Sequence, residues 1–417
     1  MWLVAKGTGA GAYTLSMTQT TASSRVLPLS GITVLSLEHA IAAPFCSRQL
    51  ADMGARVIKV ERPRVGDFAR KYDERVNGEA SHFVWTNRSK ESITLDLKHP
   101  DAQPLLRQLL AQSDVLLQNL APGAAARMGL SYDDLKDEFP RLIVCDISGY
   151  GADGPHRDRK AYDLLIQSEA GFLSVTGTPE VPSKAGCSIA DIAAGMYAYT
   201  SILNALLLRN ATGQGSAIDV SMLESLAEWM NFPLYYAYEG APAPSRTGAS
   251  HATIFPYGPF KAGDGRTVML GLQNEREWAL FCEHVLLQPE LTQDPRFASN
   301  SLRNQQREAL RALIESAFAS LTAEDLVARL DQAGIANANM NDMADVWAHP
   351  QLRARDRWVT VGSPGGPIPA LKPPGRNSAF EPRMQAVPRL GEHTEAILSG
   401  LGLTAEQIEG LRAQGAI

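Results

Sequence analysis

Short apolar runs alternate with amphipathic stretches in the first half of the chain. Residues 32–37 and 56–61 have the pattern of strands, and residues 44–53 between them have the spacing of a helix. The same unit recurs over residues 92–119. Strands that alternate with helices of this length are typical of a parallel sheet with helices on its faces. We therefore predict an α/β fold whose large domain has a Rossmann-like layout.

The pattern changes beyond a long apolar helix predicted over residues 188–209. Residues 239–259 are rich in glycine and proline, and a hairpin-like segment over residues 258–270 is followed by further helical patterns. This change predicts a second, smaller α+β domain. The predicted divisions are a disordered N-terminal extension (1–27), the first part of the large domain (28–222), a linker (223–245), the small domain (246–320), a second linker (321–350) and a C-terminal part that returns to the large domain (351–417).

Composition narrows the functional classes. The 417 residues are 45% hydrophobic and 20% charged, the balance of a globular protein, and the net charge of −6 gives no basic footprint for nucleic acid. The four cysteines are scattered without a C-x-x-C spacing, so we expect no metal site and a reducing, cytoplasmic setting. No apolar run reaches about 18 residues without a break, so we expect no contact with a membrane.

One carboxylate lies in an unusual setting. Asp191 is surrounded by small and apolar residues, and the nearest cations in sequence are Lys184 and Arg209. A charge in such a place is either satisfied structurally, for instance at a helix N-cap, or held there for chemistry. A carboxylate can attack an acyl group to give an anhydride that a second acid then opens. Asp191 is therefore the candidate nucleophile.

A dinucleotide site is not predicted, although the layout is Rossmann-like. The first strand–helix turn, residues 38–44, lacks the G-x-G-x-x-G pattern that cradles a pyrophosphate. The glycines at positions 7, 9 and 11 have the wrong spacing and no strand before them. The sequence therefore argues against a nicotinamide oxidoreductase.

Five motifs in order resemble the class III CoA-transferases, the family of formyl-CoA transferase and carnitine CoA-transferase, from about residue 28 onward. Each motif alone is weak, but the ordered set is specific. The motifs are Pro28–Gly31, Gly54–Glu61, Asn119–Gly123 with Arg127-Met-Gly129, Asp191-x-x-x-Gly195-Met196, and Thr212-Gly-Gln-Gly215 followed by Met222.

This resemblance implies an enzyme that uses CoA thioesters as substrates, holds no permanent cofactor, and forms a homodimer of interlocked, ring-like subunits. It implies that Asp191 is acylated and then carries CoA as an aspartyl thioester. Water must be kept away from such intermediates. The positions that match CoA contacts of the family are Arg62, Leu95, Lys98, Asn119, Arg127, Lys160 and Met222.

The acid substrate is expected to differ from oxalate or formate. Ile41 stands where formyl-CoA transferase has a glutamine, and the family's glycine run is replaced by the segment from Arg246 to His251. Arg246 and His251 could bind a second carboxylate, or they could be a loop charge and a turn residue. His39 could approach the thioester or be a structural loop histidine. The pattern resembles the subgroup that acts on mesaconate, itaconate, citramalate or succinate. We expect succinyl-CoA as donor and itaconate, mesaconate or a related C4–C5 dicarboxylate as acceptor.

Two alternatives remain open at this stage. An α-methylacyl-CoA racemase shares the fold, but it needs a histidine followed by aspartate as one of its two bases. This chain has Tyr162-Asp163 there, and a tyrosine pKa near ~10 suits that role poorly. The other alternative is a protein that binds CoA without catalysis.

Overall fold

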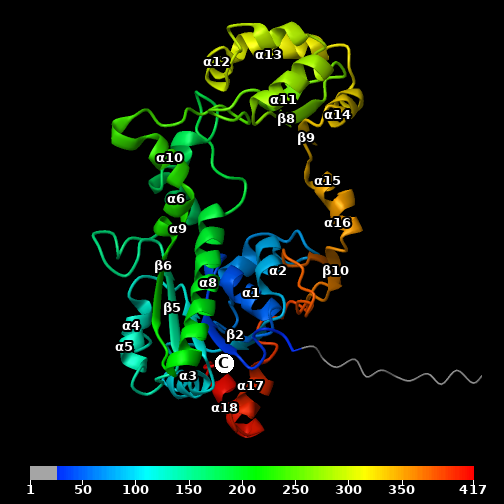
Figure 1. Ribbon diagram of the computed structural model, residues 1–417. Coiled ribbons are helices and arrows are strands. Elements are labelled where there is room, and N and C mark those ends of the chain that lie inside the picture. Colours follow the sequence, from blue (N-terminus) through cyan, green and yellow to red (C-terminus); the bar gives the residue numbers. More distant parts are fainter. Residues whose placement is uncertain (1–25) are drawn as a thin grey trace, which may run out of the picture.

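A computed structural model describes residues 26–417 (Figure 1). The predicted disordered extension, residues 1–27, lies outside the described residues except for its last two.

The central element is a six-stranded parallel sheet, as predicted. Its strand order is that of a dinucleotide-binding Rossmann sheet, with the reversal of strand order between β1 and β4. Val34 of β1 pairs with Val57 on one side and Val115 on the other. In spatial order the strands are β3 (Glu91–Thr94), β2 (Arg56–Glu61), β1 (Thr33–Leu37), β4 (Val115–Gln118), β5 (Ile143–Ser148) and β6 (Ala217–Ser221).

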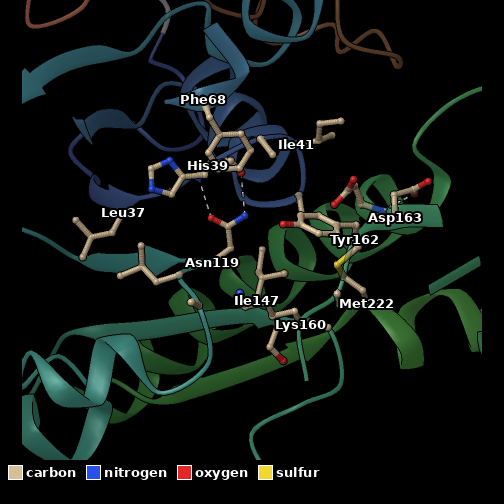
Figure 2. Close-up of a pocket in the computed structure, with 18 of the residues that line it drawn as sticks. Leu37, His39, Ile41, Phe68, Asn119, Ile147, Lys160, Tyr162, Asp163 and Met222 are labelled. Atoms are coloured by element: carbon tan, nitrogen blue, oxygen red, sulfur yellow. Dashed lines mark hydrogen bonds between the residues drawn. The ribbon is translucent and has the colours of Figure 1, made fainter. Parts of the chain in front are cut away.

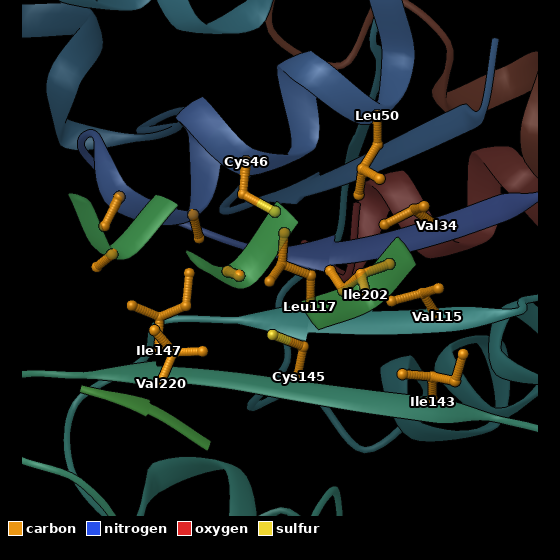
Figure 3. Close-up of a cluster of buried hydrophobic side chains, with 14 of the residues drawn as sticks. Val34, Cys46, Leu50, Val115, Leu117, Ile143, Cys145, Ile147, Ile202 and Val220 are labelled. Atoms are coloured by element: carbon orange, nitrogen blue, oxygen red, sulfur yellow. The ribbon is translucent and has the colours of Figure 1, made fainter. Parts of the chain in front are cut away.

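Helices cover both faces of this sheet, because successive residues of each strand point to opposite faces and are apolar on both. On one face Val34, Val115 and Leu117 pack under α1 (Ala42–Asp52) and α8 (Ile189–Thr212), as Figure 3 shows. The alternate residues of the strands face the other core, and three of the helices that contribute to it have seven or more residues. They are α3 (Ala102–Ala111), α17 (Thr394–Gly400) and α18 (Ala405–Ala413).

Helix α8 is the longest helix described. Its 24 residues are long and apolar enough to cross a membrane by length and composition alone. In the fold its buried face packs on α1 and against β5 and β6. The shorter helices of the large unit are α2 (Ser81–Asn87), α4 (Ala124–Arg127), α5 (Tyr132–Leu135), α6 (Asp163–Glu169), α7 (Phe172–Val175), α9 (Met222–Trp229) and α10 (Asn231–Tyr236).

A second unit has its own core around an antiparallel sheet in the order β7-β8-β9. The predicted hairpin forms its first two strands, and the third strand was not predicted. The strands are β7 (Tyr257–Lys261), β8 (Thr267–Gly271) and β9 (Ala336–Asn339), and the helices are α11 (Glu275–Leu280), α12 (Asn300–Gln305), α13 (Arg307–Phe318) and α14 (Ala323–Gln332).

Two separate segments join this second unit to the parallel sheet (Figure 1). The chain leaves through α9 and α10 and returns through α15 (Met343–Ala348) and α16 (Pro350–Ala354). It then forms a hairpin of β10 (Trp358–Val361) and β11 (Ile368–Leu371). The sequence pattern did not predict these two strands.

Candidate active site

The reversal of strand order opens a cavity at the carboxyl ends of the strands, the usual ligand site of such sheets. Its volume is about 1080 Å³, at the upper end for ligand pockets. The segments that follow β1, β2, β3, β4 and β5 all contribute to its wall, together with the start of α8. The cavity is therefore large enough for an extended ligand such as a CoA thioester.

Most of the predicted site residues line this one cavity, although they are far apart in the sequence (Figure 2). Nine of the twelve do so: His39, Ile41, Arg62, Leu95, Lys98, Asn119, Lys160, Asp191 and Met222.

Three predicted residues lie elsewhere. Arg127 is at the end of α4, between two cavity-lining residues, and its guanidinium lies 3.4 and 3.5 Å from the carbonyl of Pro122. Arg246 donates to the carbonyls of Thr178 and Pro179, both at 2.8 Å. His251 stacks on Tyr257, and its Nδ1 accepts two backbone N–H bonds. Within a single chain, Arg246 and His251 therefore do not line the cavity that holds Asp191.

Asp191 occupies the first turn of α8, and it is not the N-cap. The N-cap is Ser188, whose side chain makes no capping bond. The Asp163 side chain caps the helix instead, because its Oδ1 accepts the N–H of Ala190 at 2.8 Å and that of Asp191 at 3.4 Å. Across residues 26–417, the Asp191 carboxylate has neither a hydrogen-bond partner nor an ion pair. It is therefore free to meet a ligand.

The surroundings of Asp191 disfavour its charge. Burial, and then the negative charge of Asp163, raise the pKa of Asp191 to about 7 from its ordinary value of 3.8. A carboxylate that is partly removed from water and has no partner is a more basic nucleophile than one in water. Perturbed acids of this kind gather at functional sites.

Helices α1 and α8 meet closely beside Asp191. Gly195, one turn further along α8, makes this possible, because a Cβ there would lie 2.7 Å from the carbonyl oxygen of Ala42. Ile41 and Ala42 line the cavity at the start of α1, and their N–H groups donate to no acceptor in the described part of the chain. Two free donors at the positive end of an 11-residue helix thus border the cavity wall.

The turn that carries these donors is clamped by Asn119. Its side-chain amide accepts the N–H of His39 and donates to the carbonyl of the same residue, each at 2.9 Å, as the dashed lines in Figure 2 mark. The resemblance matched Asn119 to a position that contacts CoA. In this structure its amide is used to hold the turn between β1 and α1.

Three of the basic side chains on the cavity wall have no acid to neutralise them. Arg62, Lys98 and Lys160 follow β2, β3 and β5, and none of them forms an ion pair with a carboxylate of residues 26–417. Free cations at the carboxyl ends of parallel strands suit a ligand with phosphate groups.

Several cavity residues gave no signal in the sequence. Asp163 drew notice only as part of the dipeptide that differs from the racemases, yet it caps α8 beside Asp191. Tyr72 and His82 line the cavity with their rings 5.5 Å apart. Burial, with Asp67 and Asp191 nearby, raises the pKa of Tyr72 to about 12, so its hydroxyl stays a donor at neutral pH. Such residues lie in loops and short helices without periodicity, and only the fold brings them together.

The described residues contain no group of three or more His, Cys, Asp or Glu side chains arranged to hold a metal ion. The four cysteines are free.

Comparison with known proteins places this geometry in a family. The model of CoA-transferase family III matches residues 29–394. An acyl-CoA transferase of Fusarium pseudograminearum is 36% identical over 95% of this chain and 90% of its own length. Mouse succinyl-CoA:glutarate CoA-transferase is 34% identical over 89% of this chain and 86% of its own. The succinyl-CoA:mesaconate CoA-transferase of Haloarcula hispanica is 30% identical over 91% of this chain and 98% of its own.

Solved structures support the same family assignment. The crystal structure of a CAIB/BAIF family protein from Brucella suis has a TM-score of 0.80 and 35% sequence identity, covering 90% of this chain and 99% of that one. The sequence resemblance is thereby confirmed, as are the α/β fold and the enzyme class. The chain belongs to CoA-transferase family III.

Proposed function

We propose that this enzyme transfers CoA from succinyl-CoA to a C4–C5 dicarboxylate, with Asp191 as the acyl acceptor. The observation that carries the proposal is the Asp191 carboxylate, unpartnered among the described residues, in the same cavity as three unpaired cations. The names of the relatives support the substrate class, because the mouse enzyme is named for CoA transfer between succinyl-CoA and glutarate and the Haloarcula enzyme for transfer between succinyl-CoA and mesaconate. Itaconate is also a five-carbon dicarboxylate, and we include it in the proposal for this reason.

The proposed reaction has four steps. The Asp191 carboxylate attacks the thioester carbonyl, the C–S bond breaks, and a mixed anhydride and CoA thiolate form. The thiolate attacks the Asp191 carbonyl of the anhydride, which releases succinate and leaves an aspartyl-CoA thioester. The acceptor carboxylate attacks this thioester to give a second anhydride and the thiolate again. The thiolate attacks the acceptor carbonyl, so the new acyl-CoA leaves and the Asp191 carboxylate returns.

Each step passes through a tetrahedral oxyanion. We propose that the free N–H groups of Ile41 and Ala42 stabilise this charge, since both border the cavity next to the first turns of α8. Preorganised backbone donors of this kind are worth about 10²–10³ in kcat per donor removed.

The remaining cavity residues are proposed to hold CoA. Arg62, Lys98 and Lys160 would bind its phosphates, and Leu95 and Met222 would contact its apolar parts. Arg127, at the rim, would join them after a change of rotamer. Arg246 and His251 would reach an acid only from outside this cavity, so the acceptor class rests on the relatives.

The proposal is tested by mass spectrometry of the acyl-CoAs that form when succinyl-CoA is mixed with a panel of mono- and dicarboxylates. We expect new thioesters of dicarboxylates with the wild type and none with Asp191→Ala. Transfer to no acid would refute the proposal, and exchange of the α-proton with deuterium without transfer would favour a racemase.

We propose further that the working unit is a homodimer. Segments α9, α10 and the residues after them expose large apolar side chains, among them Phe232 at 56%, Leu234 at 58% and Tyr235 at 75%. Exposed apolar patches of this kind usually mark an interface with another protein surface. A second copy of the chain fits the ring-like outline that the two connecting segments give the subunit (Figure 1).

A further inference from the structure

Four charged side chains without solvent exposure lie beneath the turn between β1 and α1. Lys59 Nζ lies 2.7 Å from Asp67 Oδ2 and 3.4 Å from Glu38 Oε1, and Lys90 Nζ lies 2.7 Å from the same Glu38 oxygen. None of these groups has a part in the four transfer steps. Their place in the fold therefore calls for another explanation.

Stability alone explains such a cluster poorly. The free energy needed to take charges out of water is about as large as their mutual attraction supplies. Apolar residues of similar size in the same place often stabilise the fold equally or more. Leaving one partner of a buried pair alone, however, is strongly destabilising. A cluster of this kind therefore holds its members tightly in one arrangement.

Asp67 connects the cluster to the turn. Its Oδ2 is held by Lys59, while its Oδ1 accepts the N–H of Ala40 at 3.1 Å and that of Ala69 at 2.9 Å. Ala40 has a φ of 60°, in the left-handed region that is unfavourable for a residue with a side chain. The bond from Asp67 thus secures a backbone shape that the turn does not favour by itself.

The first turn of α1 is held by the other half of the cluster. Lys90 Nζ donates to the carbonyl of Pro44 at 3.0 Å, and Ser47 Oγ donates to Glu38 Oε2 at 2.6 Å. The next two N–H groups after Ala40 are the free donors of Ile41 and Ala42.

We propose that Asp67, fixed by Lys59, is a positioning residue that keeps the N–H groups of Ile41 and Ala42 aligned with the reacting carbonyl. This role rests on the transferase function proposed above and adds to it residues that touch no substrate. A displacement of about 1 Å at a reacting group can cost 10²-fold in rate.

A loosened turn has a second consequence, because water can reach the intermediate. Water adds to a carbonyl of the anhydride, the C–O bond breaks, and the products are the free acid and the Asp191 carboxylate, with release of protons. Hydrolysis and transfer are two fates of one intermediate. Their ratio does not depend on how much of the enzyme is folded, so it separates positioning from stability.

The test is the variant Asp67→Asn, assayed with succinyl-CoA and glutarate. The amide keeps an oxygen for the Ala40 N–H but turns its NH₂ toward the Lys59 ammonium. We expect the kcat of transfer to fall about 10- to 100-fold and the ratio of hydrolysis to transfer to rise about tenfold, with KM for succinyl-CoA nearly unchanged. Chromatography with mass detection measures both products.

Asp52→Asn is the matched control. Asp52 is an equally buried acid at the other end of α1, where Arg48 and Arg88 each approach it to 2.7 Å. This variant should lose thermal stability but keep the wild-type ratio. If Asp67→Asn does not fold, Asn119→Ala frees the same turn from its other side, and the same rise in the ratio is expected.

A wild-type ratio in both Asp67→Asn and Asn119→Ala would overturn the proposal and leave the buried charges a structural role only. A wild-type enzyme that acts on no acid would overturn the proposed function and this role with it.

Discussion

The Asp191 carboxylate must be ionised to attack a thioester, yet burial and Asp163 raise its pKa to about 7. The reactive form therefore gains population as the pH rises through about 7. We predict that kcat/KM increases from pH 5.5 and levels off above pH 8, because this parameter reports on the free enzyme. A profile that is flat over this range would contradict the assignment.

The same raised pKa predicts the pH dependence of stability. Between pH 3.8 and about 7 the folded state keeps a proton on Asp191 that the unfolded state releases, so stability falls as the pH rises through this range. Asp191→Asn removes the effect. We expect the variant to melt at a higher temperature than the wild type at pH 8 and at the same temperature near pH 3.5, as measured by calorimetry.

Asp163→Asn tests the second cause of that raised pKa. The amide oxygen can still accept the N–H of Ala190, so the start of α8 is preserved while the neighbouring charge disappears. We predict that the midpoint of the kcat/KM profile moves below pH 7 but not down to 3.8, since burial remains the larger cause. An unmoved midpoint would mean that Asp163 only caps the helix.

At the scale of elements, the site depends on how closely α1 and α8 approach. In Gly195→Ala the new Cβ would lie 2.7 Å from the Ala42 carbonyl and 3.0 Å from the ring of Phe45. Overpacking costs about 1–3 kcal/mol, more than the ~0.5–1 kcal/mol that alanine returns in a helix. We predict lower stability in urea and a lower kcat.

Gly410→Ala in α18 is the control for this prediction. Nothing lies within 4 Å of its new Cβ, so the variant should gain about 0.5–1 kcal/mol. Equal stabilities of the two variants would show that the two helices can separate without cost.

The elements themselves could largely be predicted from the sequence. The short apolar runs of residues 32–37 and 56–61, with a helical pattern between them that ends before Gly54, predicted the parallel sheet. The hairpin of β10 and β11 was not predicted, because proline usually argues against a strand. Proline is tolerated here because an edge strand does not need every backbone N–H for pairing. The strand β9, Ala-Asn-Ala-Asn, has only two alanines on its apolar face and pairs with the edge that β8 offers.

The resemblance to the family singled out Arg62 and Asn119. Both directly follow a strand, and the strand order places both at the cavity. The buried charges were not predictable, because Lys59 in an alternating strand looks like a solvent-facing residue until Asp67 and Lys90 are placed around it. The locations of Arg246 and His251 depend on long loops, whose course the sequence does not determine.

At the scale of the whole molecule, the exposed apolar side chains of α10 predict association. We expect a dimer at micromolar concentration by light scattering, and dissociation when Phe232 and Tyr235 are both changed to glutamate, because a desolvated charge opposes burial. A wild-type enzyme that is monomeric and fully active would contradict this prediction.

The covalent state of Asp191 tests the account most directly. The enzyme is incubated with succinyl-CoA alone, treated with hydroxylamine, and digested for peptide mass spectrometry, with Asp191→Asn as control. We predict a hydroxamate on Asp191 of the wild type and on no other residue. Transfer activity with Asp191 unmodified, or with the hydroxamate at another residue, would contradict the central claim.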